Sequence, residues 1–96
     1  MKNVDVLLAY YLAKITMTET VFISARDKLW SVHTEAREIG KLSILKSTAI
    51  SAAVKYVSNL PEGSCKEIKV QKPRGAYYTY WELEKDSYPP SSKPHH

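Results

Sequence analysis

Apolar residues recur every three or four positions between residues 47 and 60, a spacing that predicts an amphipathic helix. Ser47 is the expected N-cap of this helix, and Pro61 with Gly63 ends the pattern. Its apolar face comprises Ile50, Ala53, Val54, Val57 and Leu60. The opposite face, expected to be exposed, comprises Thr48, Ser51, Ala52, Lys55 and Ser58.

After this helix the apolar pattern changes to alternation. Two β-type segments, Lys66–Gln71 and Ala76–Glu84, flank the sequence Lys72-Pro73-Arg74-Gly75. The proline and the glycine of this sequence favour a tight turn. A β-hairpin is therefore predicted, with its cations at the tip and the alternating set that ends in Trp81 and Leu83 on its core face.

The first third of the chain is less regular. A helix is predicted from about residue 4 to residue 16, because apolar residues recur there at helical spacing after a possible cap at Asn3 or Asp5. Its apolar band is wide enough for burial on two sides. The band comprises Val4, Val6, Leu7, Leu8, Tyr10, Tyr11, Leu12, Ala13 and Ile15. Residues 18–26 are ambiguous between a second helical piece and an extended segment, since the β-branched residues of Val21-Phe22-Ile23 disfavour a helix. Asp27–Val32 is predicted to be a short extended element.

A short helix is also predicted just upstream of the amphipathic one. Thr34 is its expected cap, and Gly40 lies near its end. Ser43–Lys46 would form the turn, with Ile44 or Leu45 buried between the two helices. Together these elements predict a helix-turn-helix pair.

Length and composition limit the class of protein. The 96 residues are enough for one domain, assigned to residues 1–85, and the Pro- and Ser-rich residues 86–96 are predicted to be disordered. The closing His95-His96 is what the remnant of a purification tag would leave. No apolar run reaches about 20 residues and no cleavage site follows the first one, so neither a transmembrane helix nor a signal peptide is expected. The lone Cys65 cannot form an internal disulfide, which favours an intracellular, cytoplasmic protein.

The positive charge is concentrated in one part of the chain. Residues 41–81 hold seven Lys and Arg side chains and two Glu, for a net charge of +5, whereas residues 1–40 are neutral overall. Lys and Arg clusters supply most of the non-specific affinity for nucleic acids, so this distribution favours a polyanionic partner. The alternative is a charged surface that only keeps a small protein soluble.

The segment Thr34–Glu84 resembles the small winged-helix DNA-binding proteins encoded by archaeal viruses and plasmids. The resemblance rests on the helix that ends at Leu60, the Pro-Glu-Gly break after it, and the hairpin that ends in Tyr80-Trp81-Glu82-Leu83. It implies an α+β fold, a winged helix-turn-helix with three or four helices and a C-terminal β-hairpin wing. The implied function is double-stranded DNA binding, sequence-related or general, by a transcription regulator.

The resemblance also implies which residues would contact DNA. The helix would enter the major groove, and the hairpin would reach the backbone or the minor groove. The implied DNA-binding residues are Lys46, Ser47, Thr48, Ser51, Lys55, Lys69, Lys72, Arg74 and Tyr78. The alternatives for these residues are a solvated helix face, a solvated turn and cross-strand aromatic packing.

Enzymatic activity is not expected. His33 has no paired cysteine, and Ser47 and Ser51 have no base at a defined spacing. The chain has only three glycines, too few for a Gly-rich phosphate loop. No cofactor and no metal ion are predicted.

Two binding partners are predicted, and each prediction has an alternative. The basic segment favours double-stranded DNA, but winged helices also serve as protein-interaction adaptors. The wide apolar band of residues 4–16 predicts a homodimer, unless Val21–Ile23 and Trp30 fold back and cover it within one chain. No membrane partner is predicted.

Overall fold

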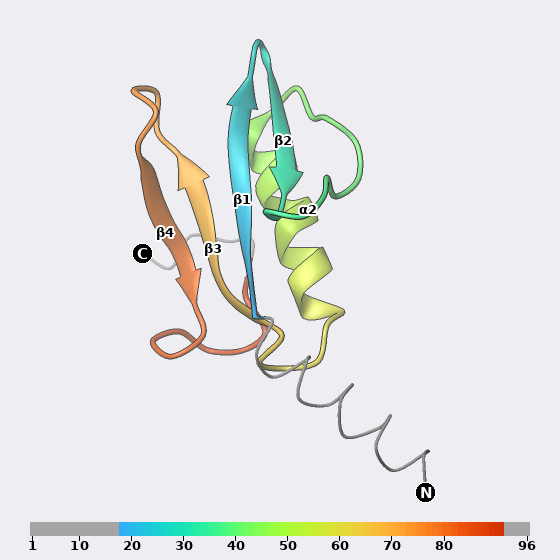
Figure 1. Ribbon diagram of the computed structural model, residues 1–96, viewed down its shortest axis with the longest axis vertical. Coiled ribbons are helices and arrows are strands. Elements are labelled where there is room, and N and C mark those ends of the chain that lie inside the picture. The colour runs from blue at the N-terminus through green and yellow to red at the C-terminus, as the bar shows by residue number, and fades with distance from the viewer. Residues whose placement is uncertain (1–17, 92–96) are drawn as a thin grey trace, which may run out of the picture.

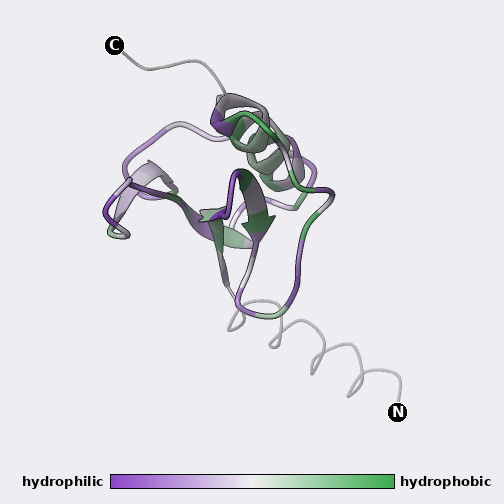
Figure 2. Ribbon diagram, turned by 90° about the horizontal axis from the view of Figure 1, so that it is seen from above, coloured by the Kyte–Doolittle hydropathy of each residue, from purple (hydrophilic) through white to green (hydrophobic). Residues whose placement is uncertain are grey.

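The protein is represented by a computed structural model, which describes residues 18–91. These residues form a small α+β fold in which one helix packs on one face of a four-stranded sheet (Figures 1 and 2). In chain order the elements are β1 (Glu19–Arg26), β2 (Leu29–His33), α2 (Lys46–Ser58), β3 (Cys65–Gln71) and β4 (Tyr77–Glu82). The helix within residues 18–91 is not long and apolar enough to cross a membrane.

The sheet is mixed, with the strand order β2-β1-β3-β4. The two hairpins, β1–β2 and β3–β4, are antiparallel, and the central strands β1 and β3 are parallel. The predicted winged helix is therefore wrong, because that fold needs three or four helices and the described part of the chain has one helix beside four strands. The predicted N-terminal helix and the dimer built on it lie outside the described residues.

Residues 19–26, left ambiguous by their sequence, form the strand β1. Val21 and Ile23 alternate onto the face covered by α2, where both are fully buried. The β-branched side chains in this segment pack well on a pleated surface and lose rotamer freedom in a helix, which explains why the segment forms a strand. Asp27 has a φ of 59° at the turn that leads into β2.

The short helix predicted after Thr34 does not form. The Thr34 hydroxyl accepts hydrogen bonds from the backbone N–H groups of Ala36 and Arg37, which closes a turn instead of a helix. The chain then follows the free edge of β2, where Ser43 and Trp30 exchange two backbone hydrogen bonds of 2.7 and 2.8 Å. Edge pairing thus satisfies backbone groups that a helix would otherwise have paired internally.

The structure confirms the predicted amphipathic helix as α2, but the helix begins at Lys46 and its N-cap is not Ser47. Ala49, Ala53 and Val57 are its fully buried residues, and the two alanines let the helix approach the sheet closely. The N-cap is Leu45, with no side-chain capping bond, so the predicted role of Ser47 is wrong. The other core residues are Val21, Ile23, Val32, Cys65, Ile68, Val70 and Trp81.

The loop before α2 exposes apolar side chains. Ile44 is 78% exposed, Leu45 61% and Leu42 45%. The prediction that Ile44 or Leu45 lies between two helices is therefore wrong, because no first helix is present here to cover them.

The β3–β4 hairpin confirms the predicted strand pair and turn, but a bulge changes its faces. The register shifts between Ile68 and Lys69, so that Trp81 pairs with Ile68 while Tyr78 pairs with Val70. Directly paired residues share a face, so Trp81 and Tyr78 both lie on the helix-covered side. Tyr77 and Thr79, predicted to share the core face with Trp81, instead pair with Gln71 and Lys69 on the opposite face.

Part of the segment predicted to be disordered packs against the domain. Trp81 donates its indole N–H to the carbonyl of Ser87 at 2.9 Å. The Tyr88 hydroxyl donates to the carbonyl of Leu60, just beyond the C-terminus of α2, and the Tyr88 ring packs against that of Trp81. The Tyr80 hydroxyl also donates to the carbonyl of Ser91 at 2.7 Å, so contacts with the domain extend to residue 91.

Candidate functional site

The two hairpin turns lie at the same end of the sheet. Because β1 and β3 are parallel, the turn after β1 and the turn after β3 both follow the carboxyl ends of the central strands (Figure 1). The first turn and its approach carry Arg26 and Lys28, and the second carries Lys72 and Arg74. We call these four residues the turn cations. Two segments about 45 positions apart in the sequence thus contribute to one basic end.

Gln71 links the end of β1 to the β3–β4 turn. Its side-chain carbonyl accepts a hydrogen bond from the backbone N–H of Ala25 at 2.8 Å, and its amide N–H donates to the carbonyl of Gly75 at 3.2 Å. One end of this amide therefore binds the β1 side and the other binds the β3–β4 turn. Gly75 adopts a φ of 99° there, a conformation that glycine tolerates best.

The turn cations differ in how far their charge is offset. Arg26 forms an ion pair with Glu38 at 2.8 Å, and both side chains are about half exposed. Within residues 18–91, Lys28, Lys72 and Arg74 form no ion pair and are exposed. These three cations are therefore available to an anionic partner.

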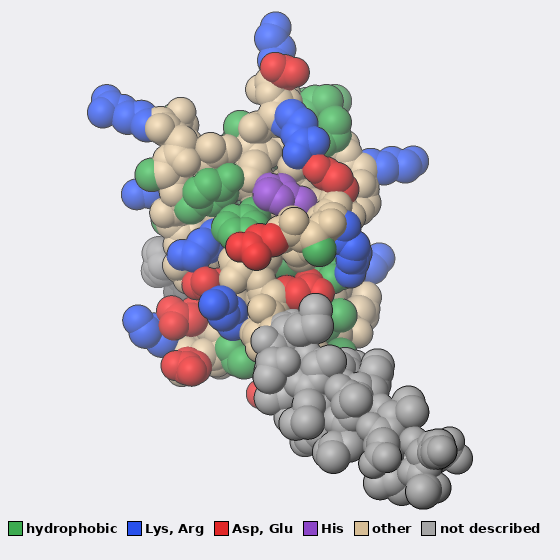
Figure 3. Space-filling model, viewed as in Figure 1, with side chains coloured by type: hydrophobic (Ala, Val, Ile, Leu, Met, Phe, Trp, Pro, Cys, Tyr) green, Lys and Arg blue, Asp and Glu red, His purple; other side chains and the backbone are tan. Residues whose placement is uncertain are grey.

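The sheet face opposite α2 carries a cluster of aromatic side chains. Phe22 of β1 stacks on His33 of β2 with ring centroids 5.5 Å apart, and the Tyr77 ring of β4 meets Phe22 edge to face at 5.5 Å. Figure 3, which looks onto this face, shows the imidazole at the surface between hydrophobic side chains. We call Phe22, His33 and Tyr77 the aromatic platform.

A hydrogen-bond chain fixes the platform. The carbonyl of Thr34 lies 3.2 Å from Nδ1 of His33 and can only accept, which places the ring proton on that nitrogen. In the neutral imidazole Nε2 then accepts from the Ser24 hydroxyl at 2.8 Å, which leaves Ser24 Oγ to accept from the Tyr77 hydroxyl at 2.6 Å. Each polar group of the chain is paired, so the orientations of the His33 and Tyr77 rings are set by their neighbours.

The Ser24–His33 contact has the distance of a nucleophile and its base, yet the surroundings do not support catalysis. Ser24 is only 9% exposed, and its hydroxyl is already held between two partners. The pocket at the other end of the sheet does not include Ser24. The contact is best understood as an anchor for the two aromatic rings.

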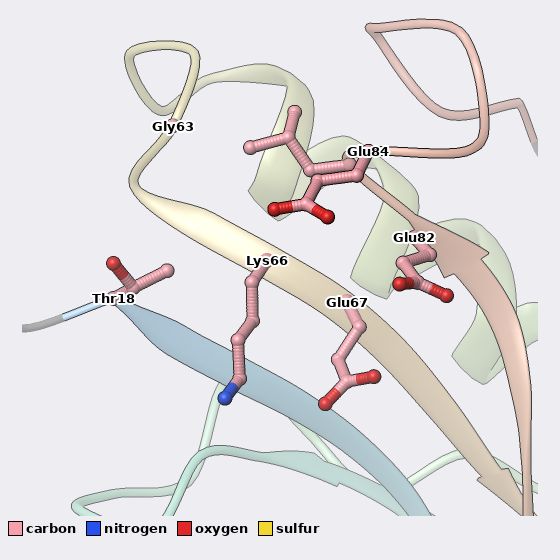
Figure 4. Close-up of a pocket in the computed structure, with 7 residues that line it drawn as sticks. Thr18, Gly63, Lys66, Glu67, Glu82 and Glu84 are labelled. Atoms are coloured by element: carbon pink, nitrogen blue, oxygen red, sulfur yellow. The ribbon is translucent and has the colours of Figure 1, made fainter.

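A shallow pocket of about 610 Å³ lies at the other end of the sheet (Figure 4). It is lined by Thr18, Gly63, Lys66, Glu67, Glu82, Leu83 and Glu84. Its acidic side chains make the charge of this end opposite to that of the turns. Residues 18–91 contain no group of acidic, His and Cys side chains suited to hold a metal ion, and we assign no site to this pocket.

The predicted DNA-binding residues do not form one surface. Ser47, Thr48, Ser51 and Lys55 are exposed on α2, which covers the face of the sheet opposite the aromatic platform. Lys46 begins the helix, and its ammonium lies 5.7 Å from the centroid of the Trp30 ring.

The predicted hairpin residues are likewise divided. Lys72 and Arg74 lie at the basic end, whereas Lys69 lies on the platform face and bonds to Thr79. Tyr78 lies on the helix-covered side and packs against the core.

Sequence reasoning missed Arg26, Lys28 and the whole aromatic platform. Their positions depend on the parallel pairing of β1 with β3 and on the bulge in the second hairpin, neither of which has a local signal. The one available clue is the Asp27-Lys28 pair between two extended segments, which is typical of a hairpin turn.

The functional assignment of this protein rests on the basic end and the aromatic platform, because comparison with known proteins provides no relative. No protein-family model, no curated protein and no solved structure matches this chain.

Proposed function

We propose that the protein binds nucleic acid, with its basic end against the phosphates. The observation that carries the proposal is that the four turn cations, from two separate hairpins, lie at one end of the sheet, where Gln71 links β1 to the β3–β4 turn. Cations that neutralise phosphates release condensed counterions, which supplies sequence-independent affinity. The winged-helix geometry, with α2 as a recognition helix, has no part in this proposal.

Asp27 in the first turn and Glu38 beside Arg26 offset part of the positive charge of the basic end, but other charges support this orientation. The first turn of α2 carries no acidic residue, and the helix begins at Lys46, next to Trp30 near the basic end. A helix N-terminus has a partial positive charge, so it adds to the field of the turn cations. The acidic side chains Glu62, Glu67, Glu82 and Glu84 lie at the opposite end, where they would repel phosphates.

Fluorescence anisotropy with a labelled oligonucleotide across a salt series tests the proposal. Replacing Lys28 and Lys72 with alanine should weaken binding and reduce the salt slope by about 1 to 2, because each lost phosphate contact removes just under one unit. Replacing Lys66 and Lys85, which lie at the acidic end, removes the same charge and serves as the matched control. Equal effects of the two double variants would contradict the proposed orientation.

A second candidate function is a protein-interaction module. Leu42, Ile44 and Leu45 are exposed next to one another, and two backbone hydrogen bonds between Ser43 and Trp30 hold the loop in place. Fixed, exposed aliphatic groups are typical of protein contacts. Two results together would support this second function. Nucleic acid does not bind, and a purified partner protein binds the native chain but not the Ile44→Ser variant.

A further inference from the structure

We infer that the ligand is a single-stranded nucleic acid whose unpaired bases stack on the aromatic platform. This inference rests on the proposed function and adds the class of ligand to it. Phe22, His33 and Tyr77 come from three of the four strands and gather on the one face of the sheet that α2 leaves uncovered.

The Tyr77 ring lies along the sheet surface. Its residue pairs with Gln71 on β3, yet its hydroxyl reaches Ser24 on β1, the strand beyond. Neighbouring strands are about 4.8 Å apart, so the side chain must cross β3 to make this 2.6 Å contact. The residue is nevertheless 38% exposed, which leaves part of a fixed ring open to solvent. A base can stack on such a ring without first ordering it.

The platform adjoins the turn cations through Gln71 and Tyr77. Gln71 bonds Ala25, close to the end of β1, and Gly75 of the second turn, and Tyr77, its cross-strand partner, begins β4 directly after that turn. Phosphates held by Lys28, Lys72 and Arg74 would therefore belong to the same ligand whose bases reach the rings. Cations beside aromatic rings form the usual combination in proteins that bind single strands.

Duplex DNA fits the platform less well. Its base faces are stacked inside the helix, and only base edges are accessible in the grooves. A broad, flat sheet face cannot reach those base faces unless the strands separate. The exposed face of α2 carries small residues such as Ser47, Thr48 and Ser51, and it lies on the far side of the sheet from the platform.

The test compares affinities for single-stranded DNA, single-stranded RNA and a DNA duplex of the same sequence and length, by fluorescence anisotropy at one salt concentration. We expect at least one single strand to bind more tightly than the duplex, and the two single-stranded arms identify the preferred sugar. Tyr77→Leu should lower the affinity for that strand roughly tenfold to a hundredfold, the value of one stacked base, with an unchanged salt slope. Tyr77→Phe keeps the ring and should retain most of the affinity.

Tyr78→Leu is the matched control, because this neighbouring tyrosine lies on the helix-covered side. Circular dichroism verifies that each variant is folded. Duplex binding as tight as single-strand binding, or a folded Tyr77→Leu variant that binds like the native protein, would overturn the ligand class but not the proposed function. Absence of binding to all three oligonucleotides would overturn both.

Discussion

Individual side chains determine how much positive charge at the basic end is available to a bound phosphate. Arg26 is the turn cation with a carboxylate partner, Glu38 at 2.8 Å, whereas the uncharged Gln71 links β1 to the β3–β4 turn. An exposed ion pair contributes little to folding stability. The effect of this pair is therefore better measured through the affinity for phosphate groups. Glu38 therefore acts as a competitor for the Arg26 guanidinium.

Glu38→Gln should strengthen nucleic-acid binding by about two- to fivefold, since it frees Arg26 from its ion pair and removes one negative charge from the basic end. Anisotropy at low salt measures this change. Glu84→Gln removes the same charge from an exposed position at the opposite end and is the control. An equal gain in the two variants would mean that net charge alone, and not the release of Arg26, explains the result.

Cys65 provides a test of core burial. Burial raises the pKa of its thiol from 9.0 to about 11. Between these values the unfolded chain loses the thiol proton while the folded chain keeps it, so ionisation favours unfolding and stability falls as the pH rises. Urea denaturation at pH 8, 9 and 10 should show a smaller alkaline loss of stability for Cys65→Ala than for the native protein. If the free energy of unfolding falls equally with pH in the two proteins, burial does not raise the pKa of the Cys65 thiol.

At the scale of elements, the segment after β4 closes one side of the core. Tyr88 joins the segment to the end of α2 through the carbonyl of Leu60, and its ring lies 6.3 Å from that of Trp81. The β4 bulge makes this possible, because it turns Trp81 inward and leaves its indole N–H to bond Ser87. A strand irregularity and a Pro-rich segment thus stabilise each other.

Tyr88→Phe should lower the free energy of unfolding by about 1 kcal/mol, the usual net value of a hydrogen bond. Tyr88→Ala should cost more, because it also removes ring packing against Trp81. Chemical denaturation monitored by the fluorescence of the two tryptophans measures both changes. Native stability in Tyr88→Ala would indicate that residues 86–91 are detached in solution, as their composition predicts.

At the scale of the whole molecule, charge is separated along the strands. A central strand of seven residues spans about 23 Å, which is more than the Debye length of about 10 Å at 0.1 M salt. The acidic end therefore has little influence on a phosphate at the turns under these conditions. At 0.01 M salt the Debye length is about 30 Å, and both ends contribute.

This separation predicts a salt-dependent effect of distant charges. Glu62→Lys with Glu84→Lys should change the affinity for nucleic acid less than about twofold at 0.1 M salt but should strengthen it clearly at 0.01 M. Anisotropy titrations at the two salt concentrations measure this difference. A large gain at 0.1 M salt would show that the acidic end itself contacts the ligand.

The sequence by itself determined the local elements whose signals lie within a few residues. The apolar spacing of α2 and the turn Lys72-Pro73-Arg74-Gly75 with its flanking strands were predicted correctly, because periodicity and turn chemistry are local properties. The sequence also identified Lys72 and Arg74 as exposed cations at a hairpin tip.

Only the tertiary structure decided the fold and the composition of the candidate site. Residues 19–26 of the ambiguous segment 18–26 became a strand because β3 and β2 pair with its two edges. The short helix predicted to start at Thr34 did not form, because the chain there pairs with the edge of β2. The parallel β1–β3 pairing brought the turn that carries Lys28 to the same end of the sheet as the turn that carries Lys72, and the bulge placed Tyr77 rather than Tyr78 next to Phe22. Pairings between distant segments depend on the packing of the whole chain, so no local pattern encodes them.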